Sequence, residues 1–425
     1  MKNTDLIAKI NKISIPLMFT SVTSLVMGMI DQIFVGHISI ESFAGVGLVV
    51  SVLNCIVGVL GVLSVGLVIQ FFDSNESERD ELIANYYVIS LMIGFLFMLI
   101  IGAFSNPILK IGFGLRDKTL YEGAGYLKIY SVSFLLNMQI FVCNTVFKIQ
   151  KTTSYIFFAS LAGNVVNIIL DYLLIFGKQG FPKLGTTGAA ISTVIALMVT
   201  LLFEMTVILK RRYICKMNCV SPEKMRDIIK YNIPLIAQEL LEGVVLVFLT
   251  NMIVGRMGAV TLAIFNISQQ LINIVLMPAY GYSSAINVLI NDDEYTRKDV
   301  AKTVIEVGTF AYFLLALIVY VNRYSILGFF GEDYRGIDSA STIILVSIII
   351  QGINYIFVLF RAMLQSMGEA EWILKITCLI NIIVSLCMIF FAKNLISLYV
   401  LLGMNYFAIS VSSARRIKRS LHNEI

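Results

Sequence analysis

The feature that most constrains this chain is a succession of long apolar runs, each about as long as a bilayer is thick. A transmembrane helix needs about 20 mainly apolar residues, because the hydrocarbon core is about 30 Å thick. Windows of this length predict about twelve spans, the last two of which are short and adjacent. Their approximate ranges are 13–36, 46–70, 86–105, 127–147, 155–176, 187–209, 233–254, 267–290, 304–321, 342–363, 374–391 and 395–411.

The composition agrees with a membrane protein made of helices. Of the 425 residues, 58% are hydrophobic and 14% are charged. A soluble domain averages about 25% charged residues, so this chain has too few charges to cover a water-facing surface of its size. Strands of a membrane barrel would alternate with period two over about 10 residues, which these runs do not. We therefore predict an all-α polytopic membrane protein.

The positions of Lys and Arg predict the orientation. One set of predicted loops and ends holds about 22 of the 32 Lys and Arg residues, the excess that marks the cytosolic side. This set comprises 1–12, 71–85, 148–154, 210–232, 291–303, 361–375 and the C-terminal tail. We predict a multi-pass protein of the cell membrane with both termini cytosolic and a short amphipathic helix ahead of the first span. The net charge of +5 comes from these loops and implies no nucleic-acid partner.

The two halves of the chain repeat four landmarks. The matched pairs are Ile15-Pro16-Leu17 with Ile233-Pro234-Leu235, Val35-Gly36 with Val254-Gly255, Asn54 with Asn273, and Asn167-Ile-Ile with Asn381-Ile-Ile. The alternative is that the similarity between the two halves is coincidental. With about six spans per half, both halves start on the same side, so the repeats are parallel. We predict an N-lobe (1–209), a cytosolic linker loop (210–232) and a C-lobe (233–425) with a basic tail. The two six-helix bundles would be related by a pseudo-two-fold axis along the membrane normal.

Two aspartates stand alone in long apolar runs. Asp31 lies in SLVMGMIDQIFVG and Asp171 in NVVNIILDYLLIF. A carboxylate at the centre of a membrane helix costs about 2.5–3.5 kcal/mol on insertion scales, so it needs a partner, a wet cavity or a role in ion transfer. Asn164, Asn167 and Asp171 are spaced i, i+3, i+7 and share one helical face. Counted from the cytosolic ends, Asp31 and Asp171 lie at depths that agree within about 3 Å.

These residues predict a cation-coupling site for H⁺ or Na⁺. Two neighbouring carboxyls can share a proton. Alternatively, Asp31, Asp171 and Asn167 would supply the oxygen ligands of a bound Na⁺. Asn164 and, from the fourth span, Asn144 are candidate neighbours. Structural pairing of each Asp with Ser, Thr or Asn is the other interpretation.

Other polar residues within the spans are candidates for a substrate cavity. They are Glu242, Asn137, Gln269, Asn273, Gln351 and Asn354. A role as interhelical hydrogen-bonding residues is the alternative for each amide. Glu239 lies nearer the headgroups, and Glu204 and Glu306 lie close to span ends, where we expect them to pair with loop Lys or Arg.

Several kinds of chemistry are absent from the sequence. No Gly-x₄-Gly-Lys-Ser/Thr loop is present, so ATP is not expected to drive the protein, and an ion gradient remains. The only histidines, His37 and His422, lie at a span end and in the tail, which disfavours an enzyme. Cys215 and Cys219 have no nearby His and are a weak metal signal. We expect no cofactor apart from the coupling ion.

The chain resembles the multidrug and toxic compound extrusion (MATE) family over nearly its whole length. The resemblance rests on the span from Pro16 to Asp31 followed by VGHISIESFAGVGL, on NVVNIILD ahead of LGTTGAAISTVIA, and on IPLIAQELLE with NMIVGRMGAVTLAIFNIS. It implies a twelve-helix antiporter with two lobes around a cavity. It also implies that Asp31, Asn167 and Asp171 form a cation site in the N-lobe, in the DinF-like pattern, with Asn164 and Asn144 as neighbours. Glu242 matches the seventh-helix Glu of other branches, whereas span ten has Gln351 and Asn354 where the NorM-like pattern has an acid.

We therefore predict a secondary active efflux transporter that exports organic cations or amphipathic drugs in exchange for H⁺ or Na⁺ by alternating access. The expected partners are small amphipathic or cationic molecules and the lipid bilayer, and the expected state is a monomer. A lipid-linked oligosaccharide flippase would need several Lys or Arg in its cavity, but no Lys or Arg lies deep in a predicted span, and Arg361 lies only near a span end. An intramembrane enzyme and a receptor or structural membrane protein are the remaining alternatives.

Overall fold

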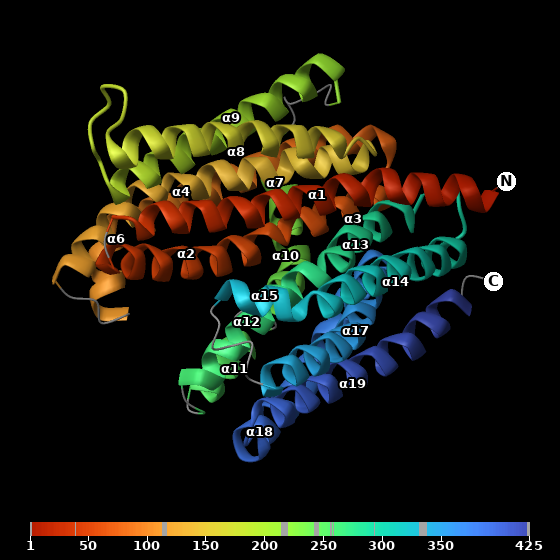
Figure 1. The fold of residues 1–425 in the computed structure, drawn as a ribbon. Helices are drawn as coiled ribbons and strands as arrows, with labels where there is room; N and C mark the ends of the chain where they lie inside the picture. The colour runs from red at the N-terminus through yellow and green to blue at the C-terminus, as the bar shows by residue number, and fades with distance from the viewer. Residues whose placement is uncertain are drawn as a thin grey trace. The chain divides into compact units, whose positions relative to one another are not determined.

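The computed structural model describes residues 2–38, 40–112, 117–213, 220–241, 246–255, 257, 259–292, 294–330 and 338–422. Throughout these residues the chain is helical or lies in short connections, which confirms the predicted all-α class. The elements are α1 (Lys2–Gly36), α2 (Ile40–Gly61), α3 (Leu63–Asp73), α4 (Glu76–Ala103), α5 (Ser105–Pro107), η1 (Ile108–Gly112), α6 (Asp117–Tyr130), α7 (Val132–Ile149), α8 (Ser154–Phe176), α9 (Thr186–Arg211), α10 (Pro222–Glu239), α11 (Val247–Gly255), α12 (Ala259–Val275), α13 (Met277–Leu289), α14 (Arg297–Val321), α15 (Arg323–Phe330), α17 (Asp338–Ser366), α18 (Ala370–Phe391) and α19 (Leu395–His422) (Figure 1).

Within the described residues, 11 helical stretches are long and apolar enough to cross a membrane. The predicted seventh span, 233–254, includes residues 242–245, which lie outside the described part of the chain, and α10 and α11 flank them. The predicted second span differs, because α2 ends at Gly61 and α3 begins at Leu63.

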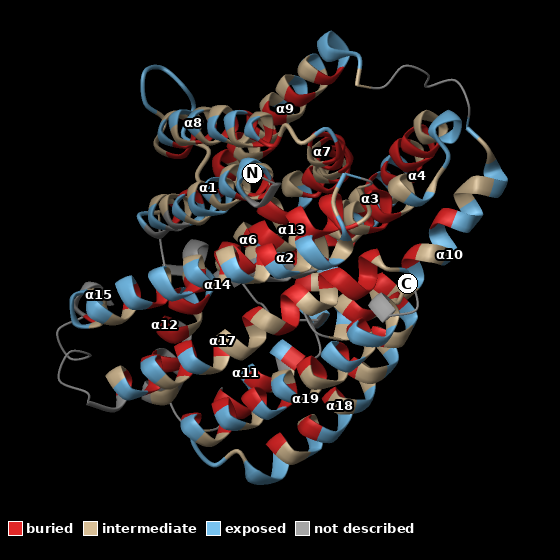
Figure 2. Cartoon of the chain, turned by 90° about the vertical axis from the view of Figure 1, so that its right-hand side faces the viewer, coloured by how far each residue is buried: buried red, intermediate tan, exposed pale blue. Residues whose placement is uncertain are grey.

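The outer faces of the long helices are apolar. Buried and exposed stripes run along the same helix, as α18 illustrates (Figure 2). Its exposed stripe includes Leu379, Ile382, Leu386 and Phe390. A soluble protein rarely exposes so continuous an apolar surface. Hydrocarbon is the environment that these faces require.

The chain divides into two compact units, which we call the N-unit (Phe19–Ile233) and the C-unit (Met1–Met18 with Pro234–Ile425). In the N-unit the closest helix pairs are α8 with α9 and α4 with α7. In the C-unit α17 packs against α19 and α13. The predicted assignment of these regions as functional lobes stays a prediction.

Two glycines let α8 and α9 approach closely (Figure 1). A Cβ atom on Gly188 would lie 2.8 Å from the backbone carbonyl carbon and oxygen of Leu174. A Cβ atom on Gly163 would lie 2.2 Å from the Thr200 hydroxyl oxygen and 3.0 Å from the Ala196 carbonyl oxygen. Each glycine therefore allows a helix contact that a larger residue would obstruct.

The boundary between the units falls inside two continuous helices. We expected a short helix ahead of the first span, but α1 runs unbroken from Lys2 to Gly36 with Pro16 inside it. Its first half belongs to the C-unit, where Lys9 contacts Glu294 and the Tyr282 hydroxyl donates to Asn11 Oδ1 at 3.1 Å. The other boundary, at Ile233 and Pro234, lies inside α10.

The predicted linker loop, 210–232, is largely helical at its ends. α9 continues to Arg211 and α10 begins at Pro222, while residues 214–219, which include Cys215 and Cys219, lie outside the described part. Lys224 Nζ lies 2.8 Å from Glu81 Oε2, and fully buried Asn232 donates from Nδ2 to the Tyr86 hydroxyl at 2.9 Å. The start of α10 is thereby fixed to the N-unit.

We expect Asn232→Ala to destabilise the protein by about 1–3 kcal/mol, because it removes a buried hydrogen bond to Tyr86. The measurement is the thermal unfolding midpoint of the purified protein in detergent. Asn251→Ala is the matched control, since Asn251 is exposed and donates to Val247 O of its own helix. Equal midpoints for the two variants would contradict this role of Asn232.

Candidate functional site

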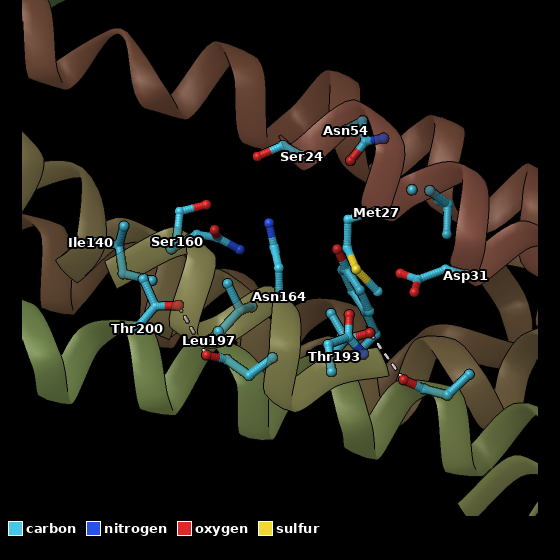
Figure 3. A pocket seen from close by; sticks show the side chains of 18 of the residues that line it. Ser24, Met27, Asp31, Asn54, Ile140, Ser160, Asn164, Thr193, Leu197 and Thr200 are labelled. Carbon is cyan, nitrogen blue, oxygen red and sulfur yellow. Dashed lines mark hydrogen bonds between the residues drawn. The ribbon is translucent and has the colours of Figure 1, made fainter. Parts of the chain in front are cut away.

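The N-unit encloses a cavity of about 450 Å³ between α1, α2, α6, α7, α8 and α9. This volume lies within the range of roughly 300–1,000 Å³ that is usual for small-molecule sites. Asp31 and Met27 of α1 and Asn164 of α8 extend into it from opposite sides, with Thr193 and Thr200 of α9 below them (Figure 3). A polar interior between apolar membrane helices requires a function, because polar groups there are costly to retain.

The structure brings the two predicted aspartates together. The carboxyl groups of Asp31 and Asp171 lie within hydrogen-bonding reach of each other. Asn167 donates from Nδ2 to Asp171 Oδ2 at 3.3 Å, and Asp171 is only 1% exposed. One oxygen of each carboxyl is buried without a hydrogen-bond partner among the described residues. The pair therefore has free acceptor capacity for a proton or a small cation.

Residues of α9 complete the surroundings of Asp171. Its carboxyl interacts with the Ser192 side chain, whose hydroxyl also donates to Gly188 O at 2.9 Å. Ser192 and Thr193 both lie in the LGTTGAAISTVIA segment, and Thr193 lines the cavity. The motif thus supplies hydroxyls beside the carboxyl pair as well as the glycine that brings α8 and α9 together. Sequence reasoning used this segment only for the resemblance and missed the hydroxyls.

Two tyrosines flank the carboxyl pair. Tyr126 and Tyr130 of α6 stack with ring centroids 5.3 Å apart, and both line the cavity near Asp31. Neither tyrosine is among the site residues predicted from the sequence. Their i, i+4 spacing on α6 is the signal that would have found them.

The other asparagines predicted for the N-lobe also line this cavity. They are Asn137, Asn144, Asn164 and Asn167, joined by the repeat landmark Asn54. Asn137 donates from Nδ2 to Ser133 O at 2.9 Å. Asn144 Oδ1 and Asn164 Nδ2 are buried without a partner among the described residues. These unpaired amide groups face a space where a ligand or water would satisfy them.

The remaining predicted cavity residues gather in the C-unit. Gln269, Asn273, Gln351 and Asn354 line a cavity of about 230 Å³ in the C-unit, whereas Asn137 lines the N-unit cavity. Asn354 donates from Nδ2 to Gln351 Oε1 at 2.7 Å. Arg361 pairs with Glu239 at 3.5 Å on the wall of this cavity. Glu242 lies outside the described residues.

The C-unit repeats the landmarks without the carboxyls. Four residues before the Val of each Val-Gly pair, the N-unit has Asp31 and the C-unit has Thr250. Four residues after the Asn of each Asn-Ile-Ile, the N-unit has Asp171 and the C-unit has Ser385. Asn381 accepts from Asn405 Nδ2 at 2.8 Å in place of the Asn167–Asp171 pair. At these two positions the N-unit has carboxyls and the C-unit has hydroxyls, while the asparagine is present in both.

Glu204 is a correction to the sequence analysis. We expected it to pair with a loop Lys or Arg, but it is 1% exposed, lines the N-unit cavity, and neither carboxylate oxygen has a hydrogen-bond partner among the described residues. Because α9 continues to Arg211, position 204 is more than a turn inside the helix. Glu306, by contrast, is exposed and lies 3.9 Å from Lys302 on its own helix.

The carboxyl pair fits a hard monovalent cation or a proton. The described residues contain no cluster of three or more His, Cys, Asp or Glu side chains that would hold a transition metal. The Ser192 side chain contacts Asp171, and Asn167 and Thr193 line the same cavity as Asp31. Oxygen ligands of this kind suit hard cations.

The fold and this site define a membrane transporter, in which paired helical units carry a buried carboxyl site beside a cavity. The family model named MatE matches residues 16–173 and 234–386, and the chain therefore belongs to the MatE family of transporters. It is thus a transporter and not an enzyme, and the resemblance seen in the sequence is confirmed.

Curated relatives and solved structures agree with this assignment. The multidrug export protein MepA of Staphylococcus saprophyticus is 23% identical over 370 residues, which cover 84% of this chain and 81% of that protein. MepA of Staphylococcus aureus is 23% identical over 371 residues, with the same coverage. A crystal structure of MATE in the bent conformation matches with a TM-score of 0.83 at 17% identity, covering 99% of this chain and 98% of that one. A MOP superfamily transporter from Pyrococcus furiosus matches with a TM-score of 0.82 at 17% identity, with the same coverage.

Proposed function

We propose that this protein exports amphipathic organic cations across the cell membrane in exchange for H⁺ or Na⁺. The observation that carries the proposal is the contact of Asp31 with Asp171 beside a cavity of about 450 Å³. The names of the MepA relatives, multidrug export proteins, support the substrate class.

Electrostatics explains why such a pair couples to an ion. Two adjacent carboxylates in an apolar interior repel each other and lose hydration, so a proton or a cation must compensate them. Release of that ion leaves an uncompensated charge and favours a different packing of α1, α8 and α9. A bound ion shifts a conformational equilibrium only by its difference in affinity for the two states. In alternating access the ion and the drug bind in turn, and this difference in affinity for the two states drives the conformational change.

The proposed orientation has both termini in the cytosol, and the proposed functional state is a monomer. The excess of Lys and Arg in the termini and in alternate loops supports the orientation. With this orientation the basic residues Lys210, Arg211 and Lys224 lie at the cytosolic end of the N-unit.

A lipid-linked oligosaccharide flippase is the second candidate, and the cavity chemistry disfavours it. Such a substrate carries phosphate, which needs Arg or Lys at its binding site. None of the described residues lining the N-unit cavity is Lys or Arg. In the C-unit cavity Arg361 pairs with Glu239 at 3.5 Å, so its charge is already compensated.

Proteoliposomes that contain purified protein and a cationic dye test the proposal. We expect an imposed pH gradient or an imposed Na⁺ gradient to drive dye movement, and the gradient that does so identifies the coupling ion. Protein-free liposomes and liposomes without a gradient are the controls. Dye movement at a rate that is independent of both gradients would exclude ion-coupled export.

A further inference from the structure

Among the described residues that line the N-unit cavity, Glu204 is the acidic side chain that the proposed coupling site does not use. It lies on α9, and both of its carboxylate oxygens are buried with no hydrogen-bond partner in the described part of the chain. No ion pair in the described part of the chain involves it. A bare carboxylate in such a place is very costly, so the group must carry a proton or face a cation.

Glu204 lines the same cavity as Asp31 but lies apart from it. Thr193, Thr200 and Glu204 follow one another along α9 at i, i+7 and i+11, and all three line the cavity. At 1.5 Å per residue, Thr193 and Glu204 are about 16 Å apart along the helix axis. Thr193 is adjacent to Ser192, which contacts Asp171. The cavity therefore has an acidic group toward each end.

Among the described residues, the titratable groups that interact with Glu204 carry no positive charge. Tyr87 of α4 and Cys143 of α7 are the titratable neighbours, and the Tyr87 hydroxyl lies 3.2 Å from Cys143 Sγ in a contact of their own. Asn144, on the same helix as Cys143, has a buried side-chain oxygen without a partner and also lines the cavity. Two acceptor groups without donors, Glu204 and Asn144, thus face the same space.

We propose that Glu204 is a second cation-binding site, which holds a proton when the cavity is empty and releases it when the positive group of an organic cation enters. This inference rests on the proposed export of organic cations. In the exchange the O–H bond of Glu204 breaks, the proton leaves to water, and the carboxylate pairs with the cation by charge attraction. The net charge of the site is the same before and after the exchange. The cavity therefore accepts a cation without retaining an uncompensated charge.

Binding of two probes of matched shape tests this inference. The first is methyltriphenylphosphonium, a cation, and the second is triphenylphosphine oxide, which is neutral and carries the same three rings. We expect Glu204→Gln to weaken binding of the phosphonium about tenfold or more, because a desolvated charge partner is lost, and to leave binding of the oxide unchanged. We also expect fewer protons to be released per phosphonium bound, measured in weakly buffered solution.

Two further variants make the result specific. Glu306→Gln removes an exposed glutamate outside the cavity and should bind both probes as the wild type does. Asp31→Asn in the same assay separates the contribution of the coupling site to phosphonium binding from that of Glu204. A Glu204→Gln variant that binds both probes as the wild type does would overturn the inference, and so would one that loses both equally, since that indicates packing. Failure of the wild type to move the phosphonium under either gradient would count against the proposed function instead.

Discussion

Replacing Asp31 by Asn is expected to reduce gradient-driven efflux to the level of protein-free liposomes. Asn preserves the shape of the side chain but cannot exchange a proton or compensate a cation with its charge. The Asp31 carboxyl faces Asp171 directly, so its loss also leaves Asp171 without its neighbour in the pair. The measurement is cationic dye efflux from proteoliposomes under the gradient that drives the wild type.

Two comparisons decide whether the loss is specific. Asp227→Asn removes an exposed aspartate of α10 and should transport normally. The double variant Asp31→Asn with Asp171→Asn should be no worse than either single variant, because groups that act as one unit are not additive. Transport by Asp31→Asn at the wild-type rate would remove the coupling role from this residue.

Gly188→Val is expected to destabilise the protein by about 3 kcal/mol or more and to lower its yield. A Cβ atom at this position would lie 2.8 Å from the backbone of Leu174, and backbone atoms cannot move aside as a flexible side chain can. α8 and α9 would separate, and with them the Asp171 and Ser192 side chains. The thermal unfolding midpoint in detergent and the fraction of monodisperse protein measure the effect.

Gly58→Val is the matched control, because nothing lies within 4 Å of a Cβ atom built on Gly58. It places the same side chain in a helix of the same unit, α2, without the close contact. If both variants unfold at the wild-type temperature, the packing of α8 against α9 does not depend on the glycine.

The position of the carboxyl pair was largely predictable because it depends on helix geometry. The spacing of Asn164, Asn167 and Asp171 fixed their common face, and the depth of Asp31 matched that of Asp171. The structure places these residues together as that arithmetic required. Their role in ion coupling stays a prediction.

Other features were not predictable from the same arithmetic. Glu204 lies near Lys210 and Arg211 in the sequence, which made pairing with them the simpler interpretation. Its burial, however, depends on where α9 ends and which helices cover it. The signal was available in its i+4 spacing from Thr200, which shares its face. Residues 1–18 belong to the C-unit, a long-range packing choice that no local pattern encodes.

The course of α1 and α10 has a consequence for how the two halves of the polypeptide depend on each other. A cut in the connection between α9 and α10 would leave the first fragment with a C-unit segment, residues 2–18, and the second with an N-unit segment, residues 222–233. Neither fragment would then be self-contained, since each would lack a helix segment carried by the other. Because each half carries a segment of the other unit, folding of the two halves is interdependent, as it is for the exchanged segments of a swapped dimer.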